Sequence, residues 1–475
     1  MADDSPYLSV VVVSRNDDHG GNPLQRTQLC INSLYEQCNR YMLPTEFIIV
    51  DWNPPSDRPG LADVIQWPED RRFIRARVIT VSPDFHRSLA HSDNLPLFQM
   101  IGKNVGIRRA CGEYVLATNI DILFSDELME YLSKRPLEHR HSYRADRFDV
   151  DSDVLNKPLP EVMPYSQEHV IRVNIKLGTF FSAWMGKAGR IVNSLSECIM
   201  RVLGNQVVAR IIDFFRKGAW FIFRSMKRGL FFGMHVIHLG IDSGKGIMFS
   251  GLNHLRNASI NLRKNILPNV SFSPVAAGIS GIIWKTMGIF RIIFGSIRKS
   301  GRSMVSRFHR RPRIHPERKN TISLMFGMIL YRLKLQLVSG FPFVHMNGCG
   351  DFTLLSKEDW DSLGGYFEAP IFSWNVDSLF LIDAYYCDIP EVYLHPPKNT
   401  FHVEHGAGSG WTPGKGEQLL FERLEKAGTP YFSWEDCLVY AERWRDAKDK
   451  IGYLHSLKKM DYGFIEWNLP ERCIE

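Results

Sequence analysis

The sequence predicts an α/β fold with a mostly parallel sheet, interrupted by an α-helical insert. Apolar runs of strand length alternate with helix-like stretches on both sides of the chain's middle, and most runs end in a polar residue. These two observations predict the sheet. A third predicts the insert: residues 172–334 carry 28 Lys and Arg against four Asp and Glu, whereas the whole 475-residue chain has a formal charge of only +7. We therefore expect two acidic flanks that form one catalytic domain around a basic insert.

The cysteines and the N-terminus point to the cytoplasm. The eight cysteines are scattered and include no C-x-x-C pair, which is typical of reduced thiols and not of a disulfide framework or a zinc site. The first residues lack the basic start and the long apolar run of a signal peptide. No uncharged apolar stretch reaches 18 residues, and the nearest candidate, Val275 to Gly295, contains Lys285 and Arg291. A helix that crosses a bilayer is therefore disfavoured.

Four strands and two helices are expected in the N-terminal flank. Continuous β-branched or apolar runs predict buried strands. The strands are expected at 8–14, 46–51, 77–81 and 112–120, and the helices at 24–38 and 103–110. Because strands and helices alternate, the strands should be parallel, with their carboxyl ends at one edge of the sheet, where ligands bind in such folds.

Polar side chains cluster at those predicted strand ends. The candidates are Ser14, Arg15, Asp17, Asp51, Asn119 and Asp121. An Asp that follows a strand often does no more than cap a turn, and each carboxylate taken alone has that simpler interpretation. Their combination at one edge predicts a nucleotide site.

Three segments in order, SVVVVSRNDD, FIIVD and KNVGIRRACGEYVLATNID, carry a family resemblance. They resemble the nucleotide half of family-2 glycosyltransferases with the GT-A fold, which implies that residues 1–165 bind a nucleotide sugar. The resemblance implies contacts from the strand-end residues and from Lys103 and Asn104. In the family the last segment ends in D-x-D, whereas here it reads Asn119-Ile120-Asp121. The metal–diphosphate contact then falls on Asp121, with Mn²⁺ or Mg²⁺ as the expected ion, and Asn119 keeps only hydrogen-bonding capacity.

The C-terminal flank, residues 340–412, resembles the acceptor half of the same family. LLSKEDWDSLGGYFE is similar to the family's segment that precedes an acidic pair, and Val376-Asp377 stands where that pair is found. The resemblance implies that Asp377 is the general base of an inverting transfer, since the acceptor hydroxyl must lose its proton as it attacks. Asp377 also begins a helix-like stretch, where a carboxylate is favoured by the helix dipole alone. Asp351 and Asp383 are the alternative bases.

A histidine-rich segment, FHVEHGAGSGW, follows at residues 401–411. Some GT-A enzymes bind the metal or the diphosphate through a late histidine, so His402 and His405 are further candidate metal ligands. Most lone histidines are structural, and that alternative stays open for both. The glycine-rich run has neither helical nor strand periodicity, which predicts a loop able to close Trp411 over a bound nucleotide sugar.

The insert, residues 166–339, is expected to form amphipathic helices. Residues 207–228 and 282–302 place Lys and Arg on one helical face and Ile and Phe on the other. This composition is typical of helices that lie on an anionic membrane surface. Packing within a helical subdomain or a homo-oligomer also fits, whereas nucleic-acid binding by residues 307–319 lacks a recognisable fold signature. The tail, residues 413–475, is expected to be helical.

Together these features predict a transferase that moves a sugar from a UDP- or GDP-sugar to a hydroxyl group. Its expected location is the cytoplasmic face of a membrane, as a peripheral or monotopic protein in glycan or glycolipid biosynthesis, with a lipid or lipid-linked acceptor. Two other classes remain: a non-catalytic GT-A-like binding or assembly module, which the loss of the first Asp of D-x-D allows, and a nucleotidyltransferase, whose glycine-rich first loop the SRNDDHGG segment matches poorly.

Overall fold

A computed structural model describes residues 5–17, 23–176, 178–181, 331–332, 334–336, 338–405, 416–458 and 460–474. The amphipathic helices expected in the insert and the loop that carries Trp411 lie outside the described residues. Among the residues that the structure describes, no helix has both the length and the apolar character needed to cross a membrane.

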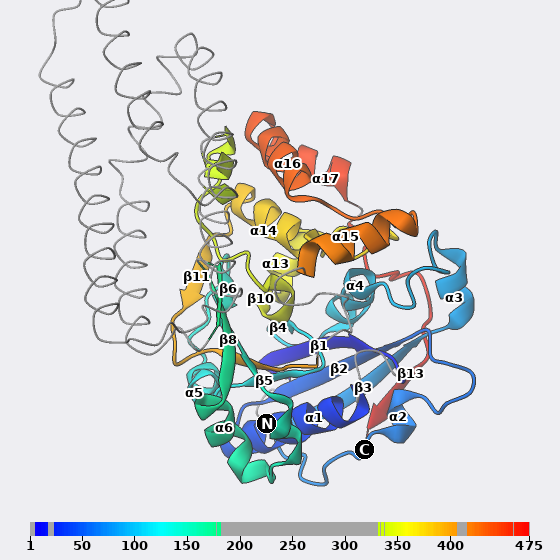
Figure 1. Cartoon of the computed structure of the whole chain (residues 1–475), viewed down its shortest axis with the longest axis vertical. Helices are drawn as coiled ribbons and strands as arrows, with labels where there is room; N and C mark the ends of the chain where they lie inside the picture. The colour runs from blue at the N-terminus through cyan, green and yellow to red at the C-terminus, as the bar shows by residue number, and fades with distance from the viewer. Residues whose placement is uncertain are drawn as a thin grey trace, which may run out of the picture. The chain divides into compact units, whose positions relative to one another are not determined.

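The larger of two sheets joins strands from both flanks of the insert (Figure 1). Its strands are β1 (Leu8–Ser14), β2 (Thr45–Trp52), β3 (Ile74–Val81), β4 (Tyr114–Ala117), β6 (Ser142–Ala145), β10 (Thr353–Ser356), β11 (Glu391–Leu394) and β13 (Glu471–Ile474). They are ordered β11-β6-β10-β4-β1-β2-β3-β13. Strands from the two flanks alternate at one side of the sheet, because β10 lies between β4 and β6. The described residues of both flanks therefore belong to one domain.

The α/β class predicted from the sequence is confirmed, and the sheet is mixed. Strands β1 to β4 are parallel, as are β6 and β11, whereas β10 and β13 run antiparallel to their neighbours. The chain passes from β1 to β2 on one side and later to β4 on the other. In sheets of this kind, the point where the strand order reverses is the usual ligand site, and here it lies at the carboxyl ends of β1 and β4.

Helices α1 (Pro23–Arg40) and α4 (Gln99–Arg109) cover opposite faces of β1 and β2 (Figure 1). Both strands are buried along their whole length, and successive side chains alternate between the two layers. Val10 packs in the layer that contains α1, whereas Val11 packs in the layer that contains α4. Helix α4 can lie this close to β1 because residue 102 is a glycine. A Cβ atom at that position would come within 2.7 Å of Val13 Cγ1.

The smaller sheet is ordered β5-β12-β7-β8-β9 and also combines both flanks. Its strands are β5 (Ile122–Phe124), β7 (Arg147–Val150), β8 (Val170–Ile175), β9 (Gly178–Phe181) and β12 (Thr400–Val403). Strand β12 lies between β5 and β7, antiparallel to the first and parallel to the second. The late histidines are thereby brought beside the segment that follows β4.

The remaining described helices and 3₁₀ turns are short. They are α2 (Leu61–Val64), α3 (Pro83–Ser88), α5 (Asp126–Ser133), η1 (Ser152–Asn156), α6 (Leu159–Glu168), η3 (Cys349–Asp351), α13 (Lys357–Ser362), α14 (Val376–Tyr386), α15 (Gly416–Lys426), α16 (Trp434–Asp446) and α17 (Lys450–Leu457). The tail is helical up to α17 and then returns to the large sheet as β13, a strand that the sequence analysis does not predict.

Candidate active site

The carboxyl ends of β1 and β2 bring Ser14 and Asp51 side by side, since the two are paired in the parallel register. Asp51 is 2 % exposed, and its Oδ2 accepts a hydrogen bond of 2.9 Å from the Leu61 N–H. Its Oδ1 is buried without a hydrogen-bond partner among the described residues. Burial raises the pKa of Asp51. The unpaired oxygen is suited to accept a hydrogen bond from a bound ligand, because leaving it unpaired is costly.

The segment after β1 continues this edge. Arg15 pairs with Asp17 at 3.0 Å between Nε and Oδ2, and it donates to the Pro96 carbonyl at 3.1 Å. Beside it lies a recess of about 510 Å³. The recess is lined by Asn16, Asp17, Pro23, Leu24, Gln25, Gln28, Arg58, Val64 and Gln66. The lining thus includes the predicted nucleotide contact Asp17, whose partner Arg15 lies beside it.

At the end of β4, Asn119 is held by three neighbours. Its amide oxygen accepts from Lys103 Nζ at 2.9 Å and from Gln99 Nε2 at 2.6 Å, while its amide nitrogen donates to Asp351 Oδ1 at 2.5 Å. The predicted sugar contact of Asn119 would therefore compete with bonds that the protein already makes. Lys103 also donates to the Gly350 carbonyl at 2.6 Å, so this cluster joins the two flanks.

Asn104 lies away from these residues, although the sequence analysis groups it with Lys103. Its amide nitrogen donates to the Tyr366 carbonyl and to Glu368, both at 2.9 Å, and its oxygen accepts from the Tyr366 N–H at 2.8 Å. Adjacent residues of a helix point in different directions, so Lys103 faces the strand ends while Asn104 secures the segment after α13. In the structure, the hydrogen bonds of Asn104 join α4 to the segment that follows α13.

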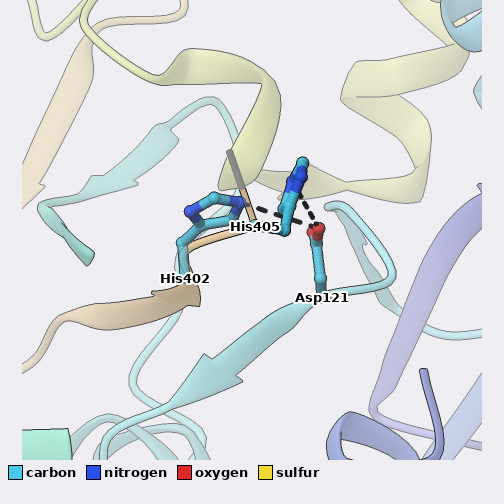
Figure 2. Close-up of side chains that lie close together, drawn as sticks. All are labelled: Asp121, His402 and His405. Atoms are coloured by element: carbon cyan, nitrogen blue, oxygen red, sulfur yellow. Dashed lines mark ion pairs between the residues drawn. The ribbon is translucent and has the colours of Figure 1, made fainter. Parts of the chain in front are cut away.

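Asp121, His402 and His405 converge on one point (Figure 2). Asp121 Oδ2 lies 3.6 Å from His402 Nε2 and 3.3 Å from His405 Nε2, and one ligand atom from each residue lies within 4.8 Å of the others. Asp121 comes from the turn before β5, His402 from β12 and His405 from the segment just after it. The structure thus brings together the three metal ligands predicted from the sequence. Arg26 on α1 also approaches Asp121, at 3.7 Å.

The three side chains fit a divalent metal ion by their chemistry. They offer one carboxylate oxygen and two imidazole nitrogens, a set that transition-metal ions bind well. Burial alone would raise the pKa of Asp121, but the two imidazoles hold it well below its usual range. Burial alone would lower the pKa of His402, but Asp121 and Asp149 raise it to about 10. The negative charge of Asp121 and the positive charge of His402 therefore stabilise each other in this buried cluster.

Asp149 on β7 is a member of the site that the sequence analysis does not identify. It is fully buried, and its Oδ1 lies 3.1 Å from His402 Nδ1. Its Oδ2 accepts from Arg172 and, at 2.9 Å, from Asn174. Asp149 pairs in register with His402 on one side and Arg172 on the other. The only sequence signal is the alternation in Arg147-Phe148-Asp149-Val150, which is short and common.

Asp377 lies in the first turn of α14 and accepts from the Ser378 N–H at 2.8 Å. A Cβ atom at Gly350 would come within 3.0 Å of Asp377 Oδ2, so the carboxylate lies against the turn that contains Asp351. Desolvation raises the pKa of Asp377, and contacts with Cys349, Lys103 and Arg144 oppose that rise only in part. A raised pKa is what a general base near neutral pH requires.

The two alternative bases have protein partners. Asp351 accepts from Asn119 and pairs with Arg147 Nη1 at 2.6 Å. Asp383 is fully buried and pairs with Lys458 Nζ at 2.6 Å, and it also accepts from Tyr440 at 2.6 Å and Trp444 at 2.9 Å. These bonds place Asp383 in the packing of α14 against α16 and make Asp377 the better candidate.

Lys103 links the base candidate with the metal cluster. The side chain is fully buried, and burial lowers its pKa to about 8. Three carboxylates near it, Asp351, Asp377 and Asp121, act in the opposite direction and favour the ammonium form. Lys103 donates to Asn119, two residues before Asp121, and to the Gly350 carbonyl, and Asp377 lies against Gly350, so neighbouring residues connect the base candidate with the metal cluster.

Comparison with known proteins adds no assignment to this geometry. No protein-family model matches the chain, and no curated protein is significantly similar to it in sequence.

Proposed function

We propose that the protein is an inverting glycosyltransferase with a GT-A fold, which moves a sugar from a nucleotide-diphosphate donor to a hydroxyl acceptor. The observation that carries the proposal is the convergence of Asp121, His402 and His405 just beyond the carboxyl end of β4. Lys103 connects this cluster with the base candidate, because it donates to Asn119 and to the carbonyl of Gly350, against which Asp377 lies. The proposal combines a predicted nucleotide edge, a candidate set of metal ligands and a candidate base. These are the components that the chemistry requires.

We assign nucleoside binding and metal binding to separate groups of residues. Ser14, Arg15, Asp17 and Asp51 hold the nucleoside at the ends of β1 and β2. Asp121, His402 and His405 would hold a divalent ion, which offsets the charge of the diphosphate when bound. Because two of the three ligands are imidazoles, we expect Mn²⁺ to be bound more tightly than Mg²⁺, which prefers oxygen ligands.

Asp377 accepts the proton of the acceptor hydroxyl as the hydroxyl oxygen attacks the anomeric carbon, and the nucleoside diphosphate leaves from the opposite face of the sugar. The carboxylate must be ionised to do so, and burial raises its pKa, which makes the ionised form a stronger base. Lys103 keeps positive charge between the two ends of the site.

The proposal is tested by incubating the protein with a panel of UDP- and GDP-sugars and measuring the release of nucleoside diphosphate. We expect one donor to be consumed, and only when Mn²⁺ or Mg²⁺ is present. Tight metal-dependent nucleotide binding without consumption of any donor, even with alcohol acceptors added, would instead support a non-catalytic binding module. Release of pyrophosphate from a nucleoside triphosphate would support a nucleotidyltransferase.

We also propose that the basic insert holds the enzyme on the anionic cytoplasmic face of a membrane. The support is its composition, since residues 172–334 carry 28 basic residues against four acidic ones, and each basic residue near an anionic surface contributes about 1 kcal/mol to lipid binding. A lipid or lipid-linked acceptor would then be available at the site.

The expected result is that the intact protein floats with vesicles containing phosphatidylserine and that a variant lacking residues 185–305 does not. Binding should weaken as salt is raised, because the attraction is electrostatic. Vesicles of phosphatidylcholine alone serve as the control. An intact protein that stays at the bottom of the gradient with both kinds of vesicle contradicts the membrane proposal and leaves packing within an oligomer as the role of the insert.

A further inference from the structure

Strands β12, β7 and β8 carry a row of paired polar side chains that ends at the metal-ligand cluster. His402 pairs in register with Asp149, and Asp149 pairs with Arg172. Residues paired in register lie on the same face of a sheet, so the three side chains follow one another across it. Both Asp149 and Arg172 are buried, at 0 % and 4 % exposure.

Asp149 determines which nitrogen of His402 faces the cluster. A carboxylate only accepts hydrogen bonds, so His402 Nδ1, at 3.1 Å from Asp149 Oδ1, must carry its hydrogen. The other ring nitrogen, Nε2, points toward Asp121 and would become a metal ligand by giving up its own hydrogen when the ion binds. A buried carboxylate bonded to the far nitrogen of a ligating histidine is a common way to orient the ring and raise its basicity.

Arg172 in turn fixes Asp149 and the segment between the two histidines. Its guanidinium donates to Asp149 Oδ2 through Nε and to Glu404 through Nη2. Glu404 lies in sequence between His402 and His405. Arg147 completes the support, since its Nε lies 3.0 Å from Asp149 Oδ1 and its Nη1 pairs with Asp351. A fork-shaped guanidinium suits this double contact better than an ammonium group would.

We infer that Asp149 and Arg172 are positioning residues of the metal site. Asp149 holds His402 with Nε2 toward the metal, and Arg172 holds both Asp149 and the segment that places His405. The inference rests on the proposed metal site of Asp121, His402 and His405. It adds that residues outside the ligand set influence the affinity of this site for the metal ion. Arg172 thereby has a role in the catalytic domain, although the charge pattern alone groups it with the basic insert.

The test measures the affinity of the full-length protein for Mn²⁺ without nucleotide. The concentration of free Mn²⁺ is read from its electron paramagnetic resonance signal. We expect Asp149→Asn to weaken binding by about 10- to 100-fold, because Asn still accepts the hydrogen bond of His402 but lacks the charge. Arg172→Lys should weaken it less, since a cation remains next to Asp149 and Glu404, and Arg172→Gln should weaken it more than Arg172→Lys.

A matched control is Asp146→Asn, which alters a second buried aspartate–histidine pair. Asp146 Oδ1 lies 2.9 Å from His345 Nε2, and Asp146 Oδ2 accepts from Tyr393 at 2.6 Å. This variant should lose stability to a similar extent and keep its Mn²⁺ affinity. Thermal unfolding without metal shows which variants are folded, and Arg172→Lys is the variant to use if Asp149→Asn does not fold.

Two failures have different meanings. If the wild-type protein does not bind Mn²⁺, the metal site itself is wrong and the proposed function loses its support. If the wild type binds Mn²⁺, and folded Asp149→Asn or Arg172→Lys binds it equally well, the metal site stands and the positioning role is wrong. The same conclusion follows if Asp146→Asn weakens binding as much as Asp149→Asn does.

Discussion

Asp377→Asn is expected to lower the rate of sugar transfer by at least about 100-fold and to leave nucleotide binding unchanged. The asparagine has nearly the same shape but cannot take the proton from the acceptor hydroxyl, and general-base catalysis usually contributes that much or more. The rate of transfer at saturating donor and the dissociation constant for the nucleoside diphosphate are the two quantities to measure.

The control for this variant is Asp383→Asn on the same helix. Asp383 is buried and paired with Lys458, so its replacement should lower the stability of the protein without a comparable loss in the rate.

In the wild type, the rate should fall as the pH is lowered through the raised pKa of Asp377, because the protonated acid is not a base. Full activity of Asp377→Asn would exclude Asp377 as the base.

Asp121→Ala is expected to weaken Mn²⁺-dependent binding of UDP or GDP by more than ~100-fold. Losing a residue that orients a metal ligand typically costs 10- to 100-fold in affinity, and losing a ligand itself should cost more. His402 and His405 would also lose the carboxylate that faces both of them. Isothermal titration with and without Mn²⁺ separates the metal-dependent part of nucleotide binding from the rest.

Asp126→Ala is a suitable control for Asp121→Ala. Asp126 lies five residues further along the chain, where it pairs with Arg40 at 3.1 Å and accepts from Gln37 at 2.9 Å, outside the cluster. Nucleotide affinity should be unchanged in this variant. If Asp121→Ala binds nucleotide with Mn²⁺ as tightly as the wild type, Asp121 is not a ligand of the metal.

The sequence predicts the first strands well because their signal is local. An unbroken run of β-branched apolar residues is typical of a strand that is buried on both faces of a parallel sheet, and β1 has the predicted bounds of residues 8–14. Strand β2 extends the predicted range by one residue at each end. The ligand candidates at these strand ends follow directly, since parallel strands place their carboxyl ends at one edge.

Features that depend on distant residues are not predictable in this way. Strands β10 and β13 are each four residues long, and their antiparallel direction depends on which neighbours they join. The role of Asp149 likewise exists only because β12 and β8 pair on either side of β7. For Asn104 the sequence motif suggests a position in the site beside Lys103. Its side chain instead points to another side of the helix, where it bonds to the Tyr366 carbonyl and to Glu368.

The measurement that tests the central claim most directly is the release of nucleoside diphosphate from a panel of UDP- and GDP-sugars by the wild type, Asp377→Asn and Asp121→Ala. One donor should be consumed by the wild type only with a divalent ion, and neither variant should consume it at a comparable rate. If no donor is consumed under any condition, or if both variants consume it as fast as the wild type, the site built from Asp121, His402, His405 and Asp377 is not a glycosyltransferase active site.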